Sequence, residues 1–243
     1  ATAHRPCGST PVRTARRVLN NTGVIIAGRI LGSFISLGLF FLLTSRLSVA
    51  EFGQYSFVFF YIGLFSVVTE MGMSPVIIRE MARRRDRAGD ILGTAILVKT
   101  LLALASFVAA LALLPAIRPD QALFRLVLLL GSQIFSYPVL TCVNIYKMEL
   151  RMLIPTVADL LRNVLYLGGA WYVLRTPRLG IEHLMALASI SSLVMAFILQ
   201  RLSRRDVRIR LRWEPALARE LLRTSVPLGL SQLATVCYYR VDT

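Results

Sequence analysis

The stretch VIIAGRILGSFISLGLFFLL, from Val24 to Leu43, contains one charged residue, Arg29, among apolar and small side chains. An α-helix rises about 1.5 Å per residue, so about 20 residues cross the roughly 30 Å hydrocarbon core of a bilayer. This apolar run is longer than the about 7–15 residues of a secretory signal, and TSRLSVAEFG after it lacks a small-residue cleavage site. The stretch therefore predicts a retained membrane-spanning helix.

The composition of the 243-residue chain extends this reading to the whole protein. Hydrophobic residues make up 56% and charged residues 17%, whereas soluble domains average about 45–50% and about 25%. The sequence therefore predicts an all-α integral membrane protein. Its net charge of +15 does not indicate a nucleic-acid partner, because the basic residues lie between apolar blocks and do not form one amphipathic surface.

Further apolar segments of similar length follow the first one. They predict spans at 24–43, 55–75, 91–114, 123–145, 157–174 and 181–200. The segment 225–243 begins as a seventh span and stops within it. We therefore expect four parts: a basic tail at 1–23, a six-helix transmembrane lobe at 24–200, a basic linker at 201–224, and a truncated seventh helix at 225–243.

Basic residues alternate between the two ends of the predicted spans. The N-terminal tail and the connections at 76–90, 146–156 and 201–224 carry 19 of them, against four in the remaining connections. By the positive-inside rule, this bias places the N-terminus and the basic connections in the cytoplasm. We expect a multi-pass protein of the cytoplasmic membrane.

Other classes of chemistry have no support in the sequence. The cysteines, Cys7, Cys142 and Cys237, are far apart, and His4 and His183 are the only histidines. This pattern predicts neither a metal site nor a disulfide framework. No nucleotide-binding loop and no hydrolase or metalloprotease motif occurs. We expect a protein that is not an enzyme and that carries no cofactor.

Charged residues inside the predicted spans are the candidates for function, because each costs about 2.5–3.5 kcal/mol on insertion scales unless it faces protein or water. Counting residues from the span ends places five of them in one layer of the cytoplasmic half: Arg29, Glu70, Lys99, Asp159 and Arg162. Arg125 lies at a span edge, where its side chain can reach the interface, and we assign it no role.

Two interpretations of this layer remain open. In the first, Arg29 pairs with Glu70 and Arg162 with Asp159, so that the pairs only hold helices together. In the second, the layer lines a cavity with an excess of one positive charge. Such a cavity favours an anionic substrate such as a phosphate, because a proton or metal-cation pathway would be richer in carboxylates.

Two further features concern the helices themselves. Pro138 lies inside the fourth predicted span and is expected to kink it. Tyr61, Tyr137 and Tyr166 lie at membrane depth, where they pack in a core or stack against a sugar.

The segment 20–83 resembles the start of a polysaccharide-biosynthesis flippase of the multidrug/oligosaccharidyl-lipid/polysaccharide (MOP) exporter superfamily. The resemblance is carried by the glycine-flanked Arg29, by RLSVAEFGQY from Arg46, and by EMGMSPVIIRE from Glu70. The later SVPLGLSQLATVCYYRVDT, from Ser225, is similar to the helix that opens the second half of such proteins.

This resemblance implies 12–14 helices in two six-helix lobes, with a central cavity that opens alternately to each side. It implies a substrate of undecaprenyl-diphosphate-linked oligosaccharide, a coupling proton or sodium ion, and membrane partners from polysaccharide synthesis. The implied substrate-binding residues are Arg29, Lys99 and Arg162. Glu70, Asp159, Arg240 and Asp242 are the candidates for ion pairing or coupling. The chain departs from the family in length, so we expect it to be the N-terminal half.

Two alternatives to a lipid-linked oligosaccharide flippase are kept. One is another exporter of the same superfamily, either a multidrug antiporter or a lipid II flippase. The other is a membrane scaffold that transports nothing and recruits synthesis enzymes through its basic connections. A drug antiporter that exports cations is expected to have acidic residues dominating its cavity.

Overall fold

The computed structural model describes residues 11–149, 151–176, 179–203, 209 and 211–241. Every regular element in these ranges is a helix. The elements are α1 (Pro11–Arg46), α2 (Val49–Glu70), α3 (Met73–Arg83), η1 (Arg85–Arg87), α4 (Ala88–Ile117), α5 (Gln121–Gly131), η2 (Ser132–Phe135), α6 (Ser136–Leu140), α7 (Val143–Met148), α8 (Leu153–Arg175), α9 (Ile181–Ser203) and α10 (Pro215–Val241).

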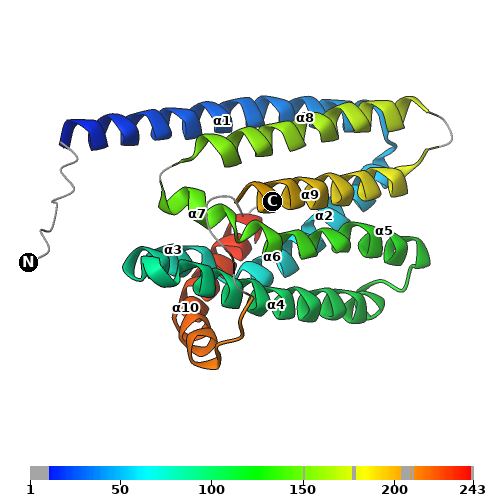
Figure 1. The fold of residues 1–243 in the computed structure, drawn as a ribbon. Helices are drawn as coiled ribbons and strands as arrows, with labels where there is room; N and C mark the ends of the chain where they lie inside the picture. The colour runs from blue at the N-terminus through cyan, green and yellow to red at the C-terminus, as the bar shows by residue number, and fades with distance from the viewer. Residues whose placement is uncertain (1–10, 150, 177–178, 204–208, 210, 242–243) are drawn as a thin grey trace, which may run out of the picture.

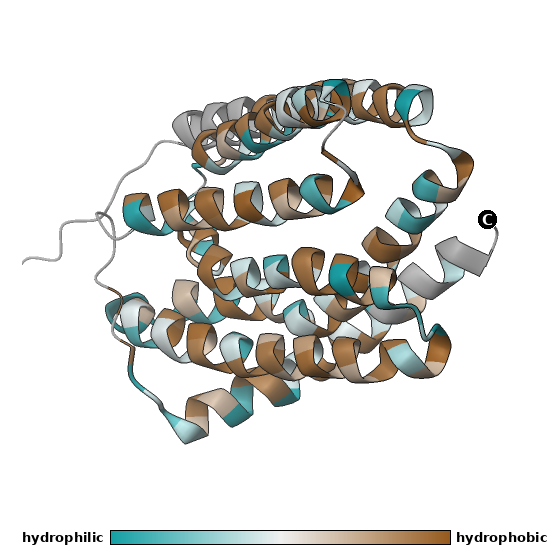
Figure 2. Cartoon of the chain, turned by 90° about the vertical axis from the view of Figure 1, so that its right-hand side faces the viewer, coloured by the Kyte–Doolittle hydropathy of each residue, from teal (hydrophilic) through white to brown (hydrophobic). Residues whose placement is uncertain are grey.

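Five helical stretches in the described residues are long and apolar enough to cross a membrane. They are Thr22–Arg46, Val49–Arg83, Arg85–Ile117, Gln121–Leu140 and Ile181–Ser203. Large apolar side chains on the outside of the bundle remain uncovered, as on α1, where Phe34 is 67% exposed. Figure 2 shows apolar residues along the helices and hydrophilic ones gathered at their ends. Lipid is the solvent that suits this surface, and the chain is a multi-pass membrane protein.

The first two helices meet in a tight connection that the local sequence explains. The Ser48 side chain accepts a hydrogen bond from the Glu51 backbone N–H, and the Glu51 carboxylate accepts one from the Ser48 N–H. This reciprocal capping box satisfies two of the backbone donors that the first turn of a helix leaves unpaired. It therefore sets the start of α2 close behind the end of α1.

The second span ends earlier than the predicted 55–75. Its helix α2 stops at Glu70, because Met71 and Gly72 adopt left-handed backbone conformations with φ of 44° and 64°. The chain then resumes as α3, so much of the predicted 76–90 connection is helical. This break matters for the site, because it places Glu70 at a helix end and Ser74 in the next first turn.

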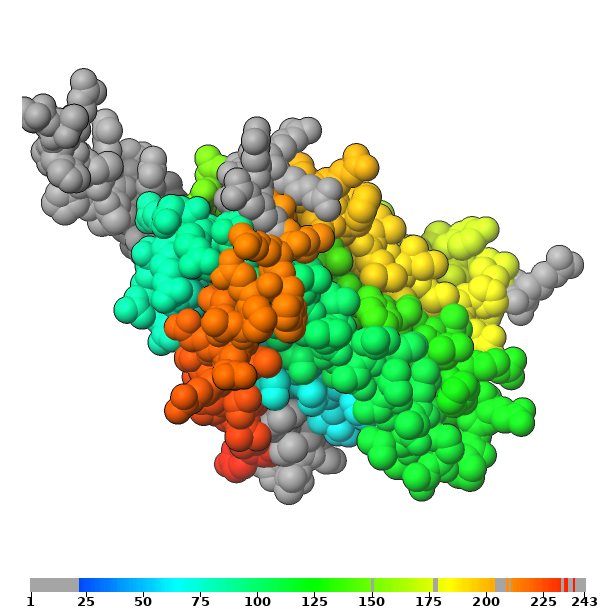
Figure 3. All heavy atoms as spheres, turned by 60° about the horizontal axis from the view of Figure 1, so that its bottom comes forward, coloured from blue at the N-terminus to red at the C-terminus, as the bar shows by residue number. Residues whose placement is uncertain are grey.

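The break packs directly against α10. A Cβ atom added at Gly72 would lie 2.8 Å from Leu228 Cβ, and one added at Gly229 would lie 3.0 Å from the Met71 carbonyl carbon. Only glycine on each side allows this backbone approach. Figure 3 shows α10, in orange and red, lying across this face of the bundle.

We expect Gly72→Ala to lower the free energy of unfolding by about 2–4 kcal/mol, because it combines a left-handed backbone with overpacking against Leu228. Denaturant unfolding in detergent micelles measures the change. Gly63→Ala is the matched control: a Cβ there meets nothing within 4 Å, and alanine is the better helix former by about 0.5–1 kcal/mol. Equal stability of the two variants would contradict the expectation.

The last helix begins before the predicted Ser225, within the predicted linker. Its first turns bury Leu217 and Leu221 against α3 and α4. Two interactions hold the preceding chain in place: Arg87 Nη2 lies 2.7 Å from Glu214 Oε2, and Thr94 Oγ1 donates to the Arg212 carbonyl at 2.9 Å. The part of the linker from residue 211 to 224 is therefore packed on the end of the bundle that carries the 83–87 and 147–151 connections, called the basic end below.

The fourth span is interrupted, as Pro138 predicts. The α-helix α5 ends at Gly131, the 3₁₀ turn η2 follows, and the short helices α6 and α7 are separated by a turn at Thr141–Cys142. Proline lacks the N–H of a helical hydrogen bond and its ring clashes with the preceding turn. The interrupted segment forms one wall of the cavity described below.

The helices are arranged in layers, with α1 and α8 side by side along one edge of the bundle and α9 next to α8 (Figure 1). The helices α2, α4, α5 and α9 enclose the larger core, around Ile62, Val127 and Leu184. Gly28 allows the α1–α8 approach, because a Cβ there would collide with the Thr156 side chain. α8 is not among the five stretches above, although it is 23 residues long.

Candidate functional site

A cavity of about 400 Å³ opens between α2, α4, the α5–α7 segment, α8 and α9. Its charged lining residues are Glu70, Lys99, Lys147, Asp159 and Arg162. Its uncharged polar lining residues are Ser74, Gln133, Ser136, Tyr137, Asn144 and Ser192. Four of the five charges that sequence analysis assigned to one layer therefore line one cavity.

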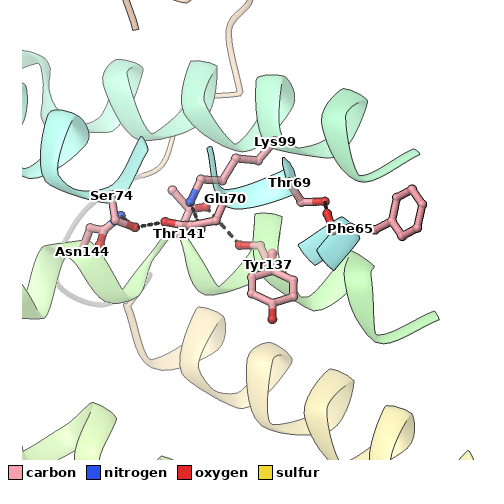
Figure 4. A network of polar contacts seen from close by, with 8 residues as sticks. All are labelled: Phe65, Thr69, Glu70, Ser74, Lys99, Tyr137, Thr141 and Asn144. Carbon is pink, nitrogen blue, oxygen red and sulfur yellow. Dashed lines mark hydrogen bonds and ion pairs between the residues drawn. The ribbon is translucent and has the colours of Figure 1, made fainter. Parts of the chain in front are cut away.

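Lys99 and Glu70 form the innermost ion pair of this cavity. The Lys99 Nζ lies 2.6 Å from Glu70 Oε2, and the lysine is 1% exposed while the Glu70 side chain is 27% exposed. The pair joins α4 to the end of α2 (Figure 4). A buried ammonium without a partner is strongly unfavourable, so Glu70 is what allows Lys99 to stay charged inside the bundle.

The second Glu70 oxygen anchors a short polar chain. Ser74 Oγ donates to Glu70 Oε1, and Asn144 Nδ2 donates to Ser74 Oγ at 3.3 Å. Figure 4 shows these side chains converging from α2, α3 and α7. The left-handed break after Glu70 makes this possible, because it turns Ser74 back toward the carboxylate. The chain orients Glu70 toward Lys99 and ties α7 to the pair.

Arg162 and Asp159 form a second, more open pair on α8. The Arg162 Nη2 donates to Asp159 Oδ1 at 2.8 Å, and the two side chains are 35% and 63% exposed. A pair this exposed contributes little stability. The guanidinium therefore keeps donors available to a cavity ligand at small cost.

Lys147 completes the set of charges and was not predicted to belong to it. Sequence analysis left it in the 146–156 connection, whereas the structure places it on α7, lining the cavity. A signal was present: Gln133, Tyr137, Asn144 and Lys147 recur at helical spacing across Pro138. A search for a polar helical face that continues through the kink would have found Lys147.

Arg29 is not among the lining residues, which differs from its expected position. It is exposed on α1 and makes no ion pair within the described part of the chain. The physical reason is the packing of α1, whose glycine-bearing face meets α8. A neighbouring residue is turned about 100° around a helix, so Arg29 points off that face. Glu70 accordingly pairs with Lys99 and not with Arg29.

The C-terminal candidates receive no test. The backbone of Arg240 is part of α10. The Arg240 side chain and all of Asp242 lie outside the described residues. Their assignment to ion pairing or coupling stays a prediction.

A second cavity of about 390 Å³ lies between α2 and α10. Ser66, Ser231, Gln232 and Thr235 line it, and Glu70 and Tyr137 line both cavities. These two residues therefore form the partition between the cavities.

The three tyrosines singled out by sequence have different roles. Tyr61 donates to the Ala110 carbonyl at 2.7 Å, and the Tyr166 hydroxyl lies 3.1 Å from the Tyr55 hydroxyl. Both are buried and internally hydrogen-bonded, as core tyrosines are. Tyr137 alone of the three lines the cavity.

The lining has an excess of one positive charge, because it holds three basic and two acidic residues. Within the described ranges, no cluster of three or more His, Cys, Asp or Glu side chains is placed to hold a metal ion. The arrangement is suited to holding an anion with several oxygens, which an ammonium and a guanidinium can contact from different helices.

Two solved structures share this fold. One is described as an outward-facing multidrug resistance MATE family transporter of the MOP superfamily; it is 17% identical, with a TM-score of 0.73 over 92% of this chain and 54% of its own. The other is a MOP superfamily transporter from Pyrococcus furiosus, described as having a binding pocket of reverse polarity that suggests a different function. It is 15% identical to this chain, with a TM-score of 0.70, and the match covers 92% of this chain and 54% of the transporter. The chain thus spans about half the length of either transporter.

No curated protein matches the sequence. The family described as polysaccharide biosynthesis protein matches residues 18–243. Because this match covers nearly all of the chain and the fold is that of MOP superfamily transporters, the chain belongs to the polysaccharide biosynthesis protein family.

Proposed function

We propose that this chain is the N-terminal lobe of a flippase that moves lipid-diphosphate-linked oligosaccharide across the cytoplasmic membrane by alternating access. Membership of the polysaccharide biosynthesis family and the MOP transporter fold support an exporter or flippase. The choice of a lipid diphosphate as passenger rests on the charge of the cavity.

The observation that carries the proposal is the position of Lys99. Its ammonium is 1% exposed, in a helix that crosses the membrane, at the wall of a cavity with two further basic residues. Basic groups at membrane depth are costly and mark substrate or ion pathways. A diphosphate offers the several charged oxygens that such a group of cations would satisfy.

The proposed topology has six spans and the start of a seventh. Five spans meet the criteria of length and hydropathy, and we assign α8 as the sixth, because its 23 residues reach about 34 Å at 1.5 Å per residue. α10 is then the seventh. The positive-inside rule places the N-terminus and the basic end in the cytoplasm. A second lobe would complete the two-lobed transporter.

Coupling to an ion gradient is assigned to the acidic residues of the cavity. Glu70 and Asp159 each neutralise a basic residue when no passenger is bound. Binding of a proton or a sodium ion to either carboxylate would release its basic partner to the diphosphate. Membrane proteins of polysaccharide synthesis would deliver and receive the passenger.

The test is a transport assay on the full-length protein as the cell makes it, reconstituted in liposomes. The probe is a fluorescent undecaprenyl diphosphate carrying a disaccharide. We expect the protein to raise its rate of transbilayer movement by about tenfold or more, because a charged headgroup crosses unaided bilayer slowly.

A cationic dye in the same liposomes separates the alternatives. Movement of the dye without movement of the lipid-linked probe would favour a drug antiporter. Movement of neither probe would favour a scaffold. Either result would overturn the proposal.

A further inference from the structure

Four uncharged side chains of the cavity have unused hydrogen-bonding groups. They are Gln133, Ser136, Tyr137 and Ser192. No side-chain partner occurs for any of them among the described residues. Figure 4 shows the Tyr137 ring directed away from the Glu70–Lys99 pair. We call these four residues the hydroxyl subsite.

Several hydroxyl groups elsewhere in the spans are satisfied within their own helix, although the buried Ser106 hydroxyl has no partner in the described part of the chain. Thr100 donates to the Ile96 carbonyl at 2.7 Å, and Ser203 donates to the Leu199 carbonyl at 2.8 Å. Ser191, next to Ser192, donates to the Ala188 carbonyl at 2.9 Å. This bonding is the usual solution for serine and threonine where water is excluded. The hydroxyl subsite departs from it and, unlike the buried Ser106, lines a cavity in which a ligand can reach its groups.

Two residues of the subsite, Gln133 and Tyr137, are separated from Lys147 along the interrupted α5–α7 wall of the cavity. The chain Glu70–Ser74–Asn144 ties the Lys99 ion pair to the level of Asn144. Tyr137 and Gln133 precede Asn144 by seven and eleven residues on this segment. Lys147 lies on the opposite side of Asn144, toward the basic end. Along the α5–α7 wall, the basic residue therefore lies nearer the basic end, and the uncharged hydrogen-bonding residues lie farther from it.

The chemistry of the uncharged end matches a neutral, polyhydroxylated group. Hydroxyls of serine and tyrosine both donate and accept, and the Gln133 amide offers two donors and an acceptor. Sugar hydroxyls have the same dual character, and the Tyr137 ring offers an apolar face to a sugar ring. A passenger that was apolar throughout would leave all of these groups unpaired.

We infer that the hydroxyl subsite binds the glycan of the passenger, while Lys99, Lys147 and Arg162 bind its diphosphate. This inference rests on the proposed function and adds an orientation: the diphosphate lies toward the basic end and the sugar lies deeper, beside Gln133 and Tyr137. The residues of the subsite then determine glycan specificity.

Two binding probes test the orientation on the full-length protein in nanodiscs: undecaprenyl diphosphate, and the same lipid carrying one N-acetylglucosamine. The wild-type protein is expected to bind the glycosylated lipid about tenfold more tightly than the bare lipid, as one or two net hydrogen bonds allow. Gln133→Leu and, separately, Ser192→Ala are expected to remove most of this difference and to leave the affinity for the bare lipid unchanged.

Matched variants exclude a merely structural effect. Ser191→Ala changes the adjacent serine, which does not line the cavity, and is expected to leave both affinities unchanged. Arg162→Ala is expected to lower the affinity for both probes by the same factor.

Equal binding of the two probes by the wild-type protein would overturn the subsite. A Gln133→Leu variant that lowers the affinity for both probes by the same factor would also overturn it. If neither the glycosylated lipid nor the bare lipid diphosphate binds, the proposed function is wrong, and the subsite inference, which rests on it, is wrong as well.

Discussion

Glu70→Gln is expected to lower the free energy of unfolding by about 3–5 kcal/mol, the cost of leaving one charge of a buried pair without its partner. The charge left behind is the Lys99 ammonium, which is 1% exposed and lies 2.6 Å from the carboxylate. Unfolding by denaturant in detergent micelles, followed by tryptophan fluorescence, measures the loss. No other ion pair that the structure describes has a basic partner as deeply buried.

Two comparisons decide whether this loss comes from the buried charge. Asp159→Asn breaks a pair whose acid is 63% exposed, so its cost is expected to stay below about 1 kcal/mol. The double variant Glu70→Gln/Lys99→Met removes both charges and is expected to recover most of the lost stability. If Glu70→Gln proves no more costly than Asp159→Asn, the pair does not hold the helices together.

The double variant also separates stability from transport. It leaves no buried charge without a partner, so the helices are expected to pack as in the wild type. It also removes the Lys99 ammonium, which the proposed function requires. We expect a well-folded protein without export activity. Normal export by the double variant would show that the pair has a structural role only.

Arg162→Ala is expected to reduce transport of the lipid-diphosphate probe about 10- to 100-fold, the range for loss of one charged hydrogen-bonding contact worth about 1.5–3 kcal/mol. Its effect on stability is expected to be small, because the Arg162 side chain is 35% exposed and its partner is largely in solvent. Transport in liposomes and thermal unfolding of the same preparation measure the two quantities.

Arg125→Ala is the matched control for this experiment. Arg125 is also a span arginine with an acidic neighbour, Glu182 at 3.7 Å, but it is 65% exposed and does not line the cavity. Its removal is expected to leave transport close to wild type. An equal loss in both variants would mean that total positive charge, and not the cavity, drives transport.

Arg29→Ala is the second comparison, because sequence analysis placed Arg29 in the cavity and the structure does not. The geometry leads us to expect a smaller loss than for Arg162→Ala. A loss of transport as large as that of Arg162→Ala would indicate that Arg29 contacts the substrate during transport.

The membrane class and most of the helices were predictable from sequence, because they depend on local composition. A run such as Val24–Leu43 is too apolar for water and long enough to cross lipid, whatever surrounds it. The kink at Pro138 was predictable for the same reason, since proline disrupts its own helix. The end of α2 at Glu70 was missed, because the left-handed Met71 depends on packing against α10.

The identities of the charged candidates also came from sequence alone, because an ionised side chain inside an apolar run is costly wherever it lies. Their partners did not. By depth, Arg29 was the expected partner of Glu70, whereas the packing of α1 on α8 and of α4 on α2 makes Lys99 the partner. Lys147 shares a polar face with Gln133, Tyr137 and Asn144 at helical spacing, but only the packing of the kinked segment shows that this face lines the cavity. Depth in a membrane is a property of position along one helix and can be counted, whereas contact requires two helices to face each other, and that is determined only when the whole bundle packs.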